Sequence, residues 1–412
     1  MLEWKLIRLG DICKTNENSY YPKDNWKFVN YLDTGSLTEN KITELQYINT
    51  KTDKMPSRAR RKVIKNSILY STVRPNQLHY GIIKEPVDNL LVSTGFTVID
   101  VDTNKAIPEF IYYLLIQNNT TEQLQAIAEQ SVSTYPSIKP SDIENLEFKL
   151  PNLIIQSKIV SILDTIDSKI CQNEKINNNL EQQAQAIFKE WFIDNPENNE
   201  WSTGTFSELI KSTLNGDWGK EAPTGNNTEK VYCIRGADIP EVKAGNKGKM
   251  PTRYILPKNY VAKQLTAGDI VVEISGGSPT QSTGRCTAIT QSLLDRYDSG
   301  MVCTNFCKAL KPKEGYSLFI YYYWQYMYGK GVFFSYENGT TGIKNLDFSG
   351  FIETETILIP PIDKIIAFDN YCNSIFSQIF ANGKQNEHLA VLRDTLLPKL
   401  MSGELDVSNI DL

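Results

Sequence analysis

The sequence predicts an α+β protein in which two pseudo-symmetric α+β domains are separated by a pair of long antiparallel coiled-coil helices. Three observations predict this fold class: an internal repeat with an offset of about 209 residues, a seven-residue apolar periodicity in the repeated segments, and short apolar runs in the two regions that precede them. A chain of 412 residues is also too long for one ordinary core, and the repeat makes two the better number of domains.

The clearest copies of the repeat are residues 150–191 and 359–400, which align without a gap. Earlier parts of the two halves match in the same order, so that the sequence KMPSR at 54–58 corresponds to KMPTR at 249–253. A chain built from two like halves is well suited to a target with two like halves, and duplex DNA is the most common such target. DNA binding is therefore the leading hypothesis.

Each repeated segment is predicted to form a long helix, because apolar residues recur every seven positions. Both series have an asparagine in the middle, where a polar residue in an apolar seam commonly fixes register. If the helices pair antiparallel with their midpoints aligned, Asn173 and Asn382 meet near the pseudo-twofold axis; the alternative is that each asparagine faces solvent. The predicted helix–helix residues are Ile159, Ile166, Asn173, Leu180 and Ile187 in the first helix, and Phe368, Ile375, Asn382, Leu389 and Leu396 in the second.

A helix of about 35 residues spans roughly 50 Å, so such a pair is predicted to act as a spacer. Pro151, and Pro360 with Pro361, are expected to open the helices. The polar stretch DNPENN at 194–199 is expected to close the first helix. The predicted division is a first α+β domain at 1–150, a first helical spacer at 151–198, a second α+β domain at 199–358 and a second helical spacer at 359–412.

The net charge of -5 does not by itself suggest a nucleic-acid-binding protein, but the positive charge is clustered. Residues 51–65 carry seven basic side chains against one acid, Asp53, and residues 243–263 carry six against none. One such tract alone is usually a solvated loop. Its recurrence beside the shared KMP[ST]R motif favours contact with phosphates, because clustered Lys and Arg release counterions from the DNA backbone.

The two large regions contain short apolar runs bounded by Gly, Asn, Asp and Pro, and each has one helical piece, so both are predicted to be α+β. Loops rich in hydrogen-bond donors and acceptors are candidates for contact with base edges, although an ordinary turn role is the alternative for each residue. The candidate DNA-binding residues are Lys54, Arg58, Arg60, Arg61, Lys62, Arg74, Asn76, Gln77, His79, Tyr80, Ser133, Thr134, Tyr135, Lys139, Lys249, Arg253, Ser278, Gln281, Ser282, Thr283, Arg285, Thr340, Thr341 and Lys344.

Catalytic motifs are missing from the sequence. Asp142, Glu147 and Lys149 superficially resemble a metal-dependent nuclease constellation, but the spacing is short and the second copy has TIL at 356–358. There is neither a phosphate-binding GxxxxGK[ST] loop nor an NPPY motif, and two histidines offer little for acid–base chemistry. We therefore predict no catalytic residue.

The cysteines and the hydropathy restrict the remaining classes. Seven scattered cysteines suit reduced thiols, and Cys303 and Cys307, although close in sequence, have no histidine near them, so no metal site is predicted. No apolar run approaches the roughly 18 to 20 residues that a membrane span requires. The N-terminus lacks the features of a secretory signal, and a cytoplasmic location is expected.

The ends of the two predicted helices carry the family resemblance. The sequence QAIFKEWF at 185–192 and the sequence LLPKLMSGEL at 396–405 resemble the two conserved-region signatures of the specificity subunit of type I restriction-modification enzymes. The signature at the start of each helix is matched by Leu150-Pro151 and more fully by IPP at 359–361, although Asn152 departs from the usual second proline. The resemblance covers the whole chain in family order but is weak in the two large regions.

The resemblance implies a non-enzymatic DNA reader. Each large region would be a target recognition domain that binds one half of a split, asymmetric sequence, and the helices would set the distance between the halves. The helices would also dock two modification subunits, which bring S-adenosylmethionine and methylate adenine after flipping it out. Restriction subunits with ATP-driven translocation and cleavage, and the magnesium these reactions use, would join that core. No cofactor is expected on this chain.

Two other classes remain open from the sequence. A tandem-domain protein-binding scaffold, in which the basic tracts are incidental, would bind partners without salt dependence and show no sequence preference in DNA. A self-contained restriction-modification enzyme is disfavoured by the missing motifs, and methylation by the purified chain alone would favour it again.

Overall fold

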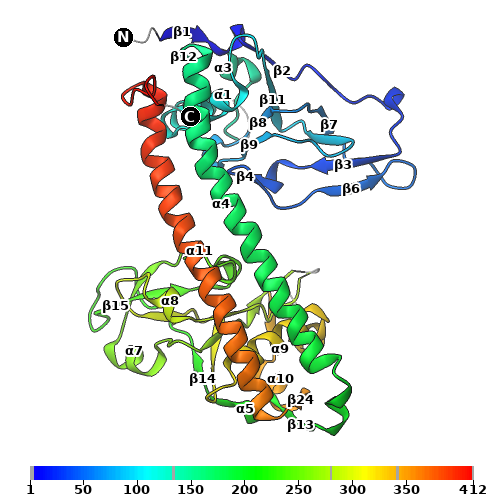
Figure 1. The fold of residues 1–412 in the computed structure, drawn as a ribbon, viewed down its shortest axis with the longest axis vertical. Helices are drawn as coiled ribbons and strands as arrows, with labels where there is room; N and C mark the ends of the chain where they lie inside the picture. Colours follow the sequence, from blue (N-terminus) through cyan, green and yellow to red (C-terminus); the bar gives the residue numbers. More distant parts are fainter. Residues whose placement is uncertain (1–3, 132–134, 279–280, 340–342, 411–412) are drawn as a thin grey trace. The chain divides into compact units, whose positions relative to one another are not determined.

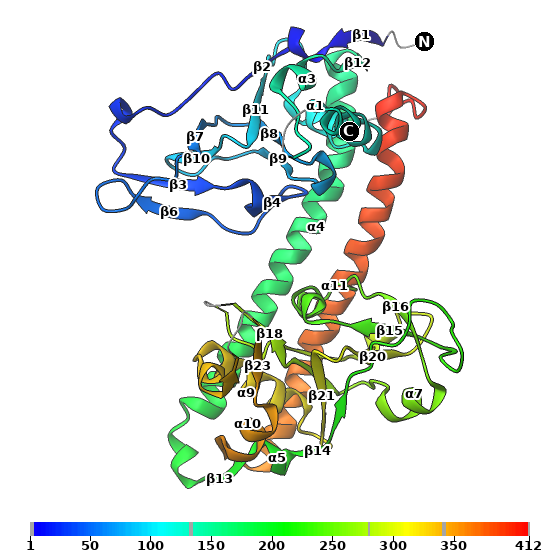
Figure 2. The same ribbon diagram turned by 180° about the vertical axis from the view of Figure 1, so that it is seen from behind.

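A computed structural model describes residues 4–131, 135–278, 281–339 and 343–410, and the chain divides into two compact units (Figures 1 and 2). The first unit comprises residues 1–167 and 391–412, and the second comprises residues 168–390. Both units mix helices and sheets, which confirms the predicted α+β class. Among the described residues, no helix has the length and apolar character needed to cross a membrane.

The first unit contains two four-stranded sheets. One is antiparallel with the strand order β2-β11-β8-β9, and the other has the order β6-β3-β10-β7, in which β3 and β10 are parallel. Two antiparallel strand pairs, β1 with β12 and β4 with β5, complete the unit. The strands are β1 (Lys5–Arg8), β2 (Cys13–Thr15), β3 (Phe28–Leu32), β4 (Leu37–Thr38), β5 (Lys41–Ile42), β6 (Gln46–Asn49), β7 (Ala59–Lys62), β8 (Ser67–Ser71), β9 (Tyr80–Ile83), β10 (Leu90–Ser93), β11 (Phe96–Val101) and β12 (Glu147–Leu150), and the helices are α1 (Pro108–Leu115), α2 (Asn118–Glu129) and α3 (Pro140–Glu144).

The core of the first unit forms around its most apolar segments. All five residues of β8 are buried, and so is every residue of α1 except Glu109, as expected for a helix that is apolar on nearly all sides. Pro108 occupies the first turn of α1, where its fixed φ suits the helix and its missing N–H costs nothing. Ile159 and Leu400, from the two long helices, belong to the same core cluster.

The second unit repeats part of this plan. Its four-stranded antiparallel sheet has the order β14-β21-β17-β19, and its three-stranded sheet β16-β15-β20 has a parallel pair, β15 with β20. A strand pair β13-β24 and a small sheet β18-β23-β22 complete it. The strands are β13 (Ser202–Thr205), β14 (Ile210–Asn215), β15 (Glu229–Ile234), β16 (Thr252–Ile255), β17 (Ile270–Glu273), β18 (Ser275–Gly276), β19 (Cys286–Ala288), β20 (Met301–Cys303), β21 (Cys307–Pro312), β22 (Glu337–Asn338), β23 (Lys344–Leu346) and β24 (Thr356–Ile359), and the helices are α5 (Phe206–Leu209), α6 (Ile239–Lys243), α7 (Pro257–Lys263), α8 (Gln291–Leu294), α9 (Ser317–Gly329) and α10 (Phe348–Thr354).

Short helical turns connect several of these elements. Both helical pieces expected from the sequence are confirmed as α1 and α9, and the YYYW run at 321–324 is buried within α9. That run therefore packs in the core and is not available to stack on bases. The 3₁₀ turns are η1 (Leu9–Asp11), η2 (Pro22–Asp24), η3 (Thr34–Ser36), η4 (Pro75–Gln77), η6 (Pro196–Glu200), η7 (Gly236–Asp238) and η8 (Val332–Tyr336), and η5 (Lys189–Ile193) is a π turn.

The two KMP[ST]R motifs lie at different edges of the corresponding sheets. The first motif leads into β7, which pairs with β10, whereas the second leads into β16, which pairs with β15. Because β3 and β10 match β15 and β20 as the parallel pair, these strands are on opposite edges. The two basic tracts, which correspond in sequence, therefore lead into strands at different edges of their sheets.

Two long helices, α4 (Leu153–Phe188) and α11 (Ile362–Ser402), each contribute residues to both units. All ten residues predicted to lie between the helices are buried or half-buried. Within the second unit the contacts run antiparallel, since Asn173 donates hydrogen bonds of 2.8 Å to Gln385 and Asn386, and Asn382 donates one of 2.8 Å to Asn177. The predicted contact between Asn173 and Asn382 is therefore wrong by one helical turn, and neither asparagine faces solvent.

Candidate nucleic-acid interface

In the first unit, the structure brings together two loops that the sequence singled out separately. Val73 and Ser137 form an antiparallel bridge, and the backbone N–H of Arg74 donates a hydrogen bond of 3.0 Å to the carbonyl of Pro136. We call residues 72–80 together with 135–139 the first loop pair. Its frame is made by backbone hydrogen bonds, so side chains can vary on it without loss of the fold.

The first loop pair exposes several of the predicted side chains. The guanidinium carbon of Arg74 lies 5.2 Å from the ring centroid of Tyr135, whose side chain is exposed. Asn76, Gln77 and Lys139 are also exposed. Arg can contact guanine, and Asn or Gln can contact adenine, through paired hydrogen bonds in the major groove. Ser133 and Thr134 lie outside the described residues.

Two other predicted residues of this loop point inward. His79 Nδ1 lies 2.7 Å from the carbonyl oxygen of Leu37 and 3.0 Å from Thr38 Oγ1. Tyr80 is buried, and its burial raises the pKa of its phenol. Both residues therefore hold the loop to the sheet rather than face a ligand, which corrects the prediction that they contact DNA.

The second unit has an equivalent arrangement. Gly276 of β18 pairs with Lys344 of β23, which joins the loop after β17 to the β22–β23 hairpin. We call residues 275–285 together with 337–346 the second loop pair; Thr340 and Thr341 lie outside its described part. Gln281 is exposed and Ser278 half-buried. In each unit, therefore, a loop that follows a buried strand is joined by backbone bridges to a second segment.

A buried glutamate organises the second loop pair. Glu337 accepts hydrogen bonds from the N–H of Thr283 at 2.6 Å and from its hydroxyl at 3.0 Å, and its other oxygen lies 2.8 Å from Lys344 Nζ. Burial acts to raise the pKa of Glu337, but the hydrogen bonds from Lys344 and Thr283 hold it below its ordinary value. Glu337 is therefore a charged anchor that links both halves of the loop pair.

Several residues of the second loop pair that were predicted to contact bases are buried or paired within the protein. Ser282 and Thr283 are buried, and the guanidinium of Arg285 binds the carboxylate of Glu273 through two hydrogen bonds of 2.8 and 2.7 Å. The pKa of Arg285 is raised mainly by these hydrogen bonds. In this state Thr283 and Arg285 shape the loop, and Gln281 is the side chain best placed to meet a ligand.

The two basic tracts have different environments. In the first, Lys54, Arg58 and Arg60 are exposed, while Arg61 is half-buried and Lys62 lies 2.9 Å from Asp24. An exposed cluster of this kind can contact phosphates. The exposed residues of the first tract are therefore accessible to a ligand, and their contact with phosphates stays a prediction.

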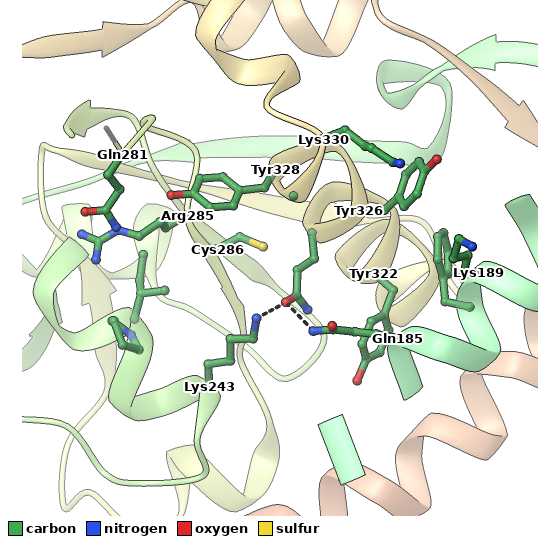
Figure 3. Close-up of a pocket in the computed structure, with 15 residues that line it drawn as sticks. Gln185, Lys189, Lys243, Gln281, Arg285, Cys286, Tyr322, Tyr326, Tyr328 and Lys330 are labelled. Carbon is green, nitrogen blue, oxygen red and sulfur yellow. Dashed lines mark hydrogen bonds between the residues drawn. The ribbon is translucent and has the colours of Figure 1, made fainter. Parts of the chain in front are cut away.

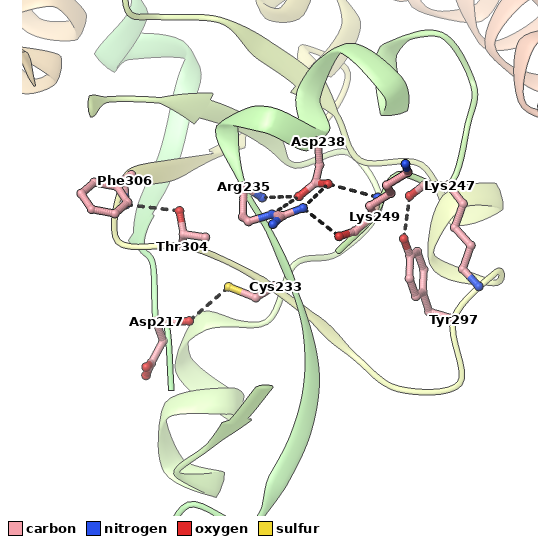
Figure 4. Close-up of polar contacts among 9 residues, drawn as sticks. All are labelled: Asp217, Cys233, Arg235, Asp238, Lys247, Lys249, Tyr297, Thr304 and Phe306. Carbon is pink, nitrogen blue, oxygen red and sulfur yellow. Dashed lines mark hydrogen bonds and ion pairs between the residues drawn. The ribbon is translucent and has the colours of Figure 1, made fainter. Parts of the chain in front are cut away.

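In the second tract most charges have internal partners. Arg253 is only 6% exposed; its guanidinium carbon lies 4.1 Å from the ring centroid of Trp218, and it donates to the Trp218 carbonyl at 2.9 Å. Lys247 Nζ lies 4.6 Å from the ring centroid of Tyr297, and the backbone of Lys249 is bonded to Arg235 and Asp238 (Figure 4). Arg253 is thus not placed to contact a phosphate, contrary to the prediction.

A cavity of about 620 Å³ lies beside the second loop pair and was not predicted from the sequence (Figure 3). Its lining includes Lys189, Lys243, Arg285 and Lys330, which come from separate elements, so no local sequence signal could reveal it. Three of these cations are paired with carboxylates outside the lining, namely those of Asp194, Glu181 and Glu273. The excess of positive charge at the cavity is therefore small.

Nothing in the described part of the chain resembles a metal centre: no group of three or more His, Cys, Asp or Glu side chains there could hold a metal ion. Cys303 and Cys307 are buried, and burial raises the pKa of the Cys307 thiol to about 12 and that of Cys303 also. A thiol held in its protonated form is a poor metal ligand. These cysteines pack in the core of the second unit.

Comparison with known proteins finds one matching family model and relatives that are named as specificity subunits. Residues 1–182 match the family model for the type I restriction modification DNA specificity domain. The chain is 27% identical to the type I restriction enzyme HindI specificity subunit of Haemophilus influenzae, over 98% of this chain and 100% of that protein. It is 26% identical to the MjaIX specificity subunit of Methanocaldococcus jannaschii, over 98% and 94% of the two chains.

A solved structure shows that the fold also agrees. The crystal structure of the type I restriction-modification system S subunit from M. genitalium superposes with a TM-score of 0.54 at 15% identity, over 97% of this chain and 96% of that chain. The family match of the first 182 residues and the near full-length relatives agree with each other. Residues 1–182 are thus similar to the type I restriction modification DNA specificity domain, and over nearly its whole length the chain is similar to proteins named as type I specificity subunits.

Proposed function

We propose that this chain is the DNA sequence-specificity subunit of a type I restriction-modification complex, and that each loop pair reads one half of a two-part DNA target. The observation that carries this proposal is the presence in each unit of a loop pair whose segments are joined by backbone bridges and which exposes different side chains. Two different half-sites require two such surfaces with different side chains. The relatives, which are named as specificity subunits, support the same role.

The residues divide into two classes of contact. In the first unit, Arg58 and Arg60 would bind phosphates and so position the unit, while Arg74 and Asn76 would contact base edges. In the second unit, Gln281 would contact bases. Phosphate contacts supply affinity that depends on salt, whereas base contacts supply sequence preference.

The chain itself would carry out no catalysis. Modification subunits would supply S-adenosylmethionine and the methyltransferase site, and restriction subunits would supply ATP- and magnesium-dependent translocation and cleavage. The helices α4 and α11 would form an antiparallel coiled-coil spacer that sets the gap between half-sites and docks the modification subunits. This work on DNA would take place in the cytoplasm.

Selection from random duplex DNA tests the proposal. The full chain, alone and with its modification subunits, is incubated with a random library, and bound DNA is sequenced at several salt concentrations. We expect two short motifs separated by a fixed gap, and affinity that falls steeply with salt. The triple variant Arg74→Ala, Asn76→Ala, Gln77→Ala should relax one motif and leave the other unchanged.

Two outcomes would contradict the proposal. Binding without sequence preference would favour a protein-binding scaffold, and relaxation of both motifs by the triple variant would show that the first loop pair does not read a separate half-site. Thermal unfolding of the variant serves as the control, because exposed side chains on a backbone frame should leave the melting temperature unchanged.

A further inference from the structure

Four asparagines form a buried cluster between α4 and α11 in the second unit. Asn173 is bonded to Asn386, and Asn382 is bonded to Asn177, with side-chain distances of 2.8 Å in both pairs. All four are at most 7% exposed. Asn177 and Asn386 are related by the same offset as Asn173 and Asn382, about 209 residues, so each pair is the counterpart of the other in the repeat.

The cluster distinguishes between two helix registers. A shift of four residues would bring Asn173 opposite Asn382 and keep the apolar face buried, but it would separate Asn177 and Asn386 from their partners. Buried amides without hydrogen-bond partners are costly. A four-residue shift corresponds to roughly 6 Å along a helix, about two base pairs of DNA at 3.4 Å each.

A loop of the second α+β domain also contacts the asparagine cluster. Asn177 Nδ2 also lies 3.1 Å from the carbonyl oxygen of Ala244, in the loop after α6. The next residue, Gly245, has φ of +86° and approaches Gly383 of α11 so closely that a Cβ on Gly383 would lie 1.9 Å from the Gly245 carbonyl oxygen. Only a glycine at 383 permits this contact between backbones.

A buried arginine completes the attachment. One guanidinium nitrogen of Arg296 donates to the Gly245 carbonyl at 2.7 Å, and the other lies 2.9 Å from Glu387 of α11. The side chain of Arg296 is 6% exposed. The loop is therefore held by α4, by α11 and by its own domain at one level of the helix pair.

We propose that the asparagine cluster and the contact between Gly245 and Gly383 fix the position of the second recognition domain along the helix pair, and thereby help to set the gap between the two half-sites. Asn173, Asn177, Asn382, Asn386, Gly245 and Gly383 are positioning residues that do not touch DNA. This inference rests on the proposed function, because a gap exists only if the target has two parts.

Two variants test it with different perturbations. The double variant Asn177→Leu, Asn382→Leu removes one asparagine pair and the hydrogen bond to Ala244 while it keeps an apolar seam, and Gly383→Ala forces the Gly245 loop away. The matched control Asn178→Leu, Asn179→Leu changes two exposed asparagines on the same helix. Each variant is assembled with its modification subunits and given DNA targets whose gap differs by one or two base pairs.

We expect both test variants to lose about tenfold of the preference for the wild-type gap over a gap two base pairs different, equivalent to about 1.4 kcal/mol. Hydrogen exchange should become faster in residues 243–249, and the melting temperature reports whether the chain is folded. The control should keep the wild-type gap and exchange rates. If the double variant does not fold, Gly383→Ala decides the question.

The outcomes separate the inference from the proposed function. A variant that is folded, exchanges faster in residues 243–249 and keeps the wild-type gap preference would overturn the inference alone. Unchanged exchange in both variants would show that the cluster does not hold the loop, and would also overturn it. A wild-type complex without any two-part preference would refute the proposed function and the inference with it.

Discussion

Arg58 and Arg253 stand at the same position of a repeated five-residue motif, yet their surroundings are opposite. Arg58 is exposed, whereas Arg253 is buried against Trp218 and lies 3.2 Å from Glu221. The motif in the sequence shows the positive charge but not the aromatic partner, because Trp218 is 35 residues away. The exposure of the guanidinium therefore decides which arginine is available to a phosphate.

The two arginines should respond differently to the same substitution. Arg58→Ala should leave the melting temperature unchanged and reduce the slope of log affinity against log salt concentration by about 1, as expected for one lost phosphate contact. Arg253→Ala should lower the free energy of unfolding by about 1–3 kcal/mol, because a stacked and hydrogen-bonded side chain is lost. Salt-titrated DNA binding and thermal unfolding measure the two effects. A stable Arg253→Ala protein with a reduced salt slope would contradict the assignment.

Among the seven cysteines, Cys171 on α4 is exposed and the other six are buried. Burial raises the pKa of the Cys286 and Cys233 thiols to about 12, which keeps them protonated and unreactive near neutral pH. One thiol per chain should therefore react quickly with a disulfide reagent under native conditions, and Cys171→Ser should abolish this fast phase. Two or more fast thiols in the wild-type chain would contradict the described packing.

At the scale of elements, the second loop pair depends on the ionised form of Glu337. Its pKa lies below the ordinary value, so its contribution to stability is fully present above the ordinary carboxyl pKa and is lost as the pH falls through the lowered value. Glu337→Gln should thus destabilise the second unit by about 1–3 kcal/mol near pH 7. Its difference from wild type should shrink below about pH 4.

Thermal unfolding across this pH range measures the effect of Glu337→Gln. The control is Glu314→Gln, which changes an exposed glutamate of the same unit and should have little effect at any pH. A difference between Glu337→Gln and wild type that stays constant from neutral to acidic pH would show that the ion pair with Lys344 is not its cause.

For the two long helices, the sequence pattern predicts the buried face but not the axial register. A seven-residue period identifies the buried face, and all ten residues expected there are buried or half-buried. The pattern does not determine the axial stagger, because asparagines at 173 and 177 allow two registers with the same buried face. Side-chain hydrogen bonds to Asn382 and Asn386 resolve that choice, and they depend on the three-dimensional pairing of the helices.

For the loop pairs too, the sequence predicts one feature and not another. Donor-rich composition singled out segments that include residues 74–80 and 276–285, and in the described residues backbone bridges join Val73 to Ser137 and Gly276 to Lys344. Composition did not predict which side chains turn inward. His79 and Thr283 are held by backbone and carboxylate groups far along the chain, so their roles require the tertiary structure. The four-part division of the chain into domains and spacers stays a prediction.

At the scale of the whole molecule, the proposed spacer makes a quantitative prediction. The variant has four residues inserted in α4 after Asp167 and four inserted in α11 after Ala390, which are the positions where the chain divides into its two units. The two insertions are at one level, because Asp167 lies 3.0 Å from Arg393 within the first unit. Because both helices are lengthened at one level, the asparagine cluster keeps its register. The gap between half-sites should grow by about two base pairs.

Selection from a DNA library with variable gaps measures this change. Insertion in α4 alone serves as the control, since it disrupts the pairing of the helices and should weaken binding at every gap. A double-insertion variant that keeps the original gap would show that α4 and α11 do not set the spacing.

A map of methylated adenines in genomic DNA exposed to this chain and its modification subunits would show whether each loop pair reads one half of a two-part target. Two short motifs separated by one fixed gap are expected, and exchange of the first loop pair for that of a relative should change one motif only. Methylation at a single continuous motif, or methylation without sequence preference, would show that the two loop pairs do not read separate half-sites.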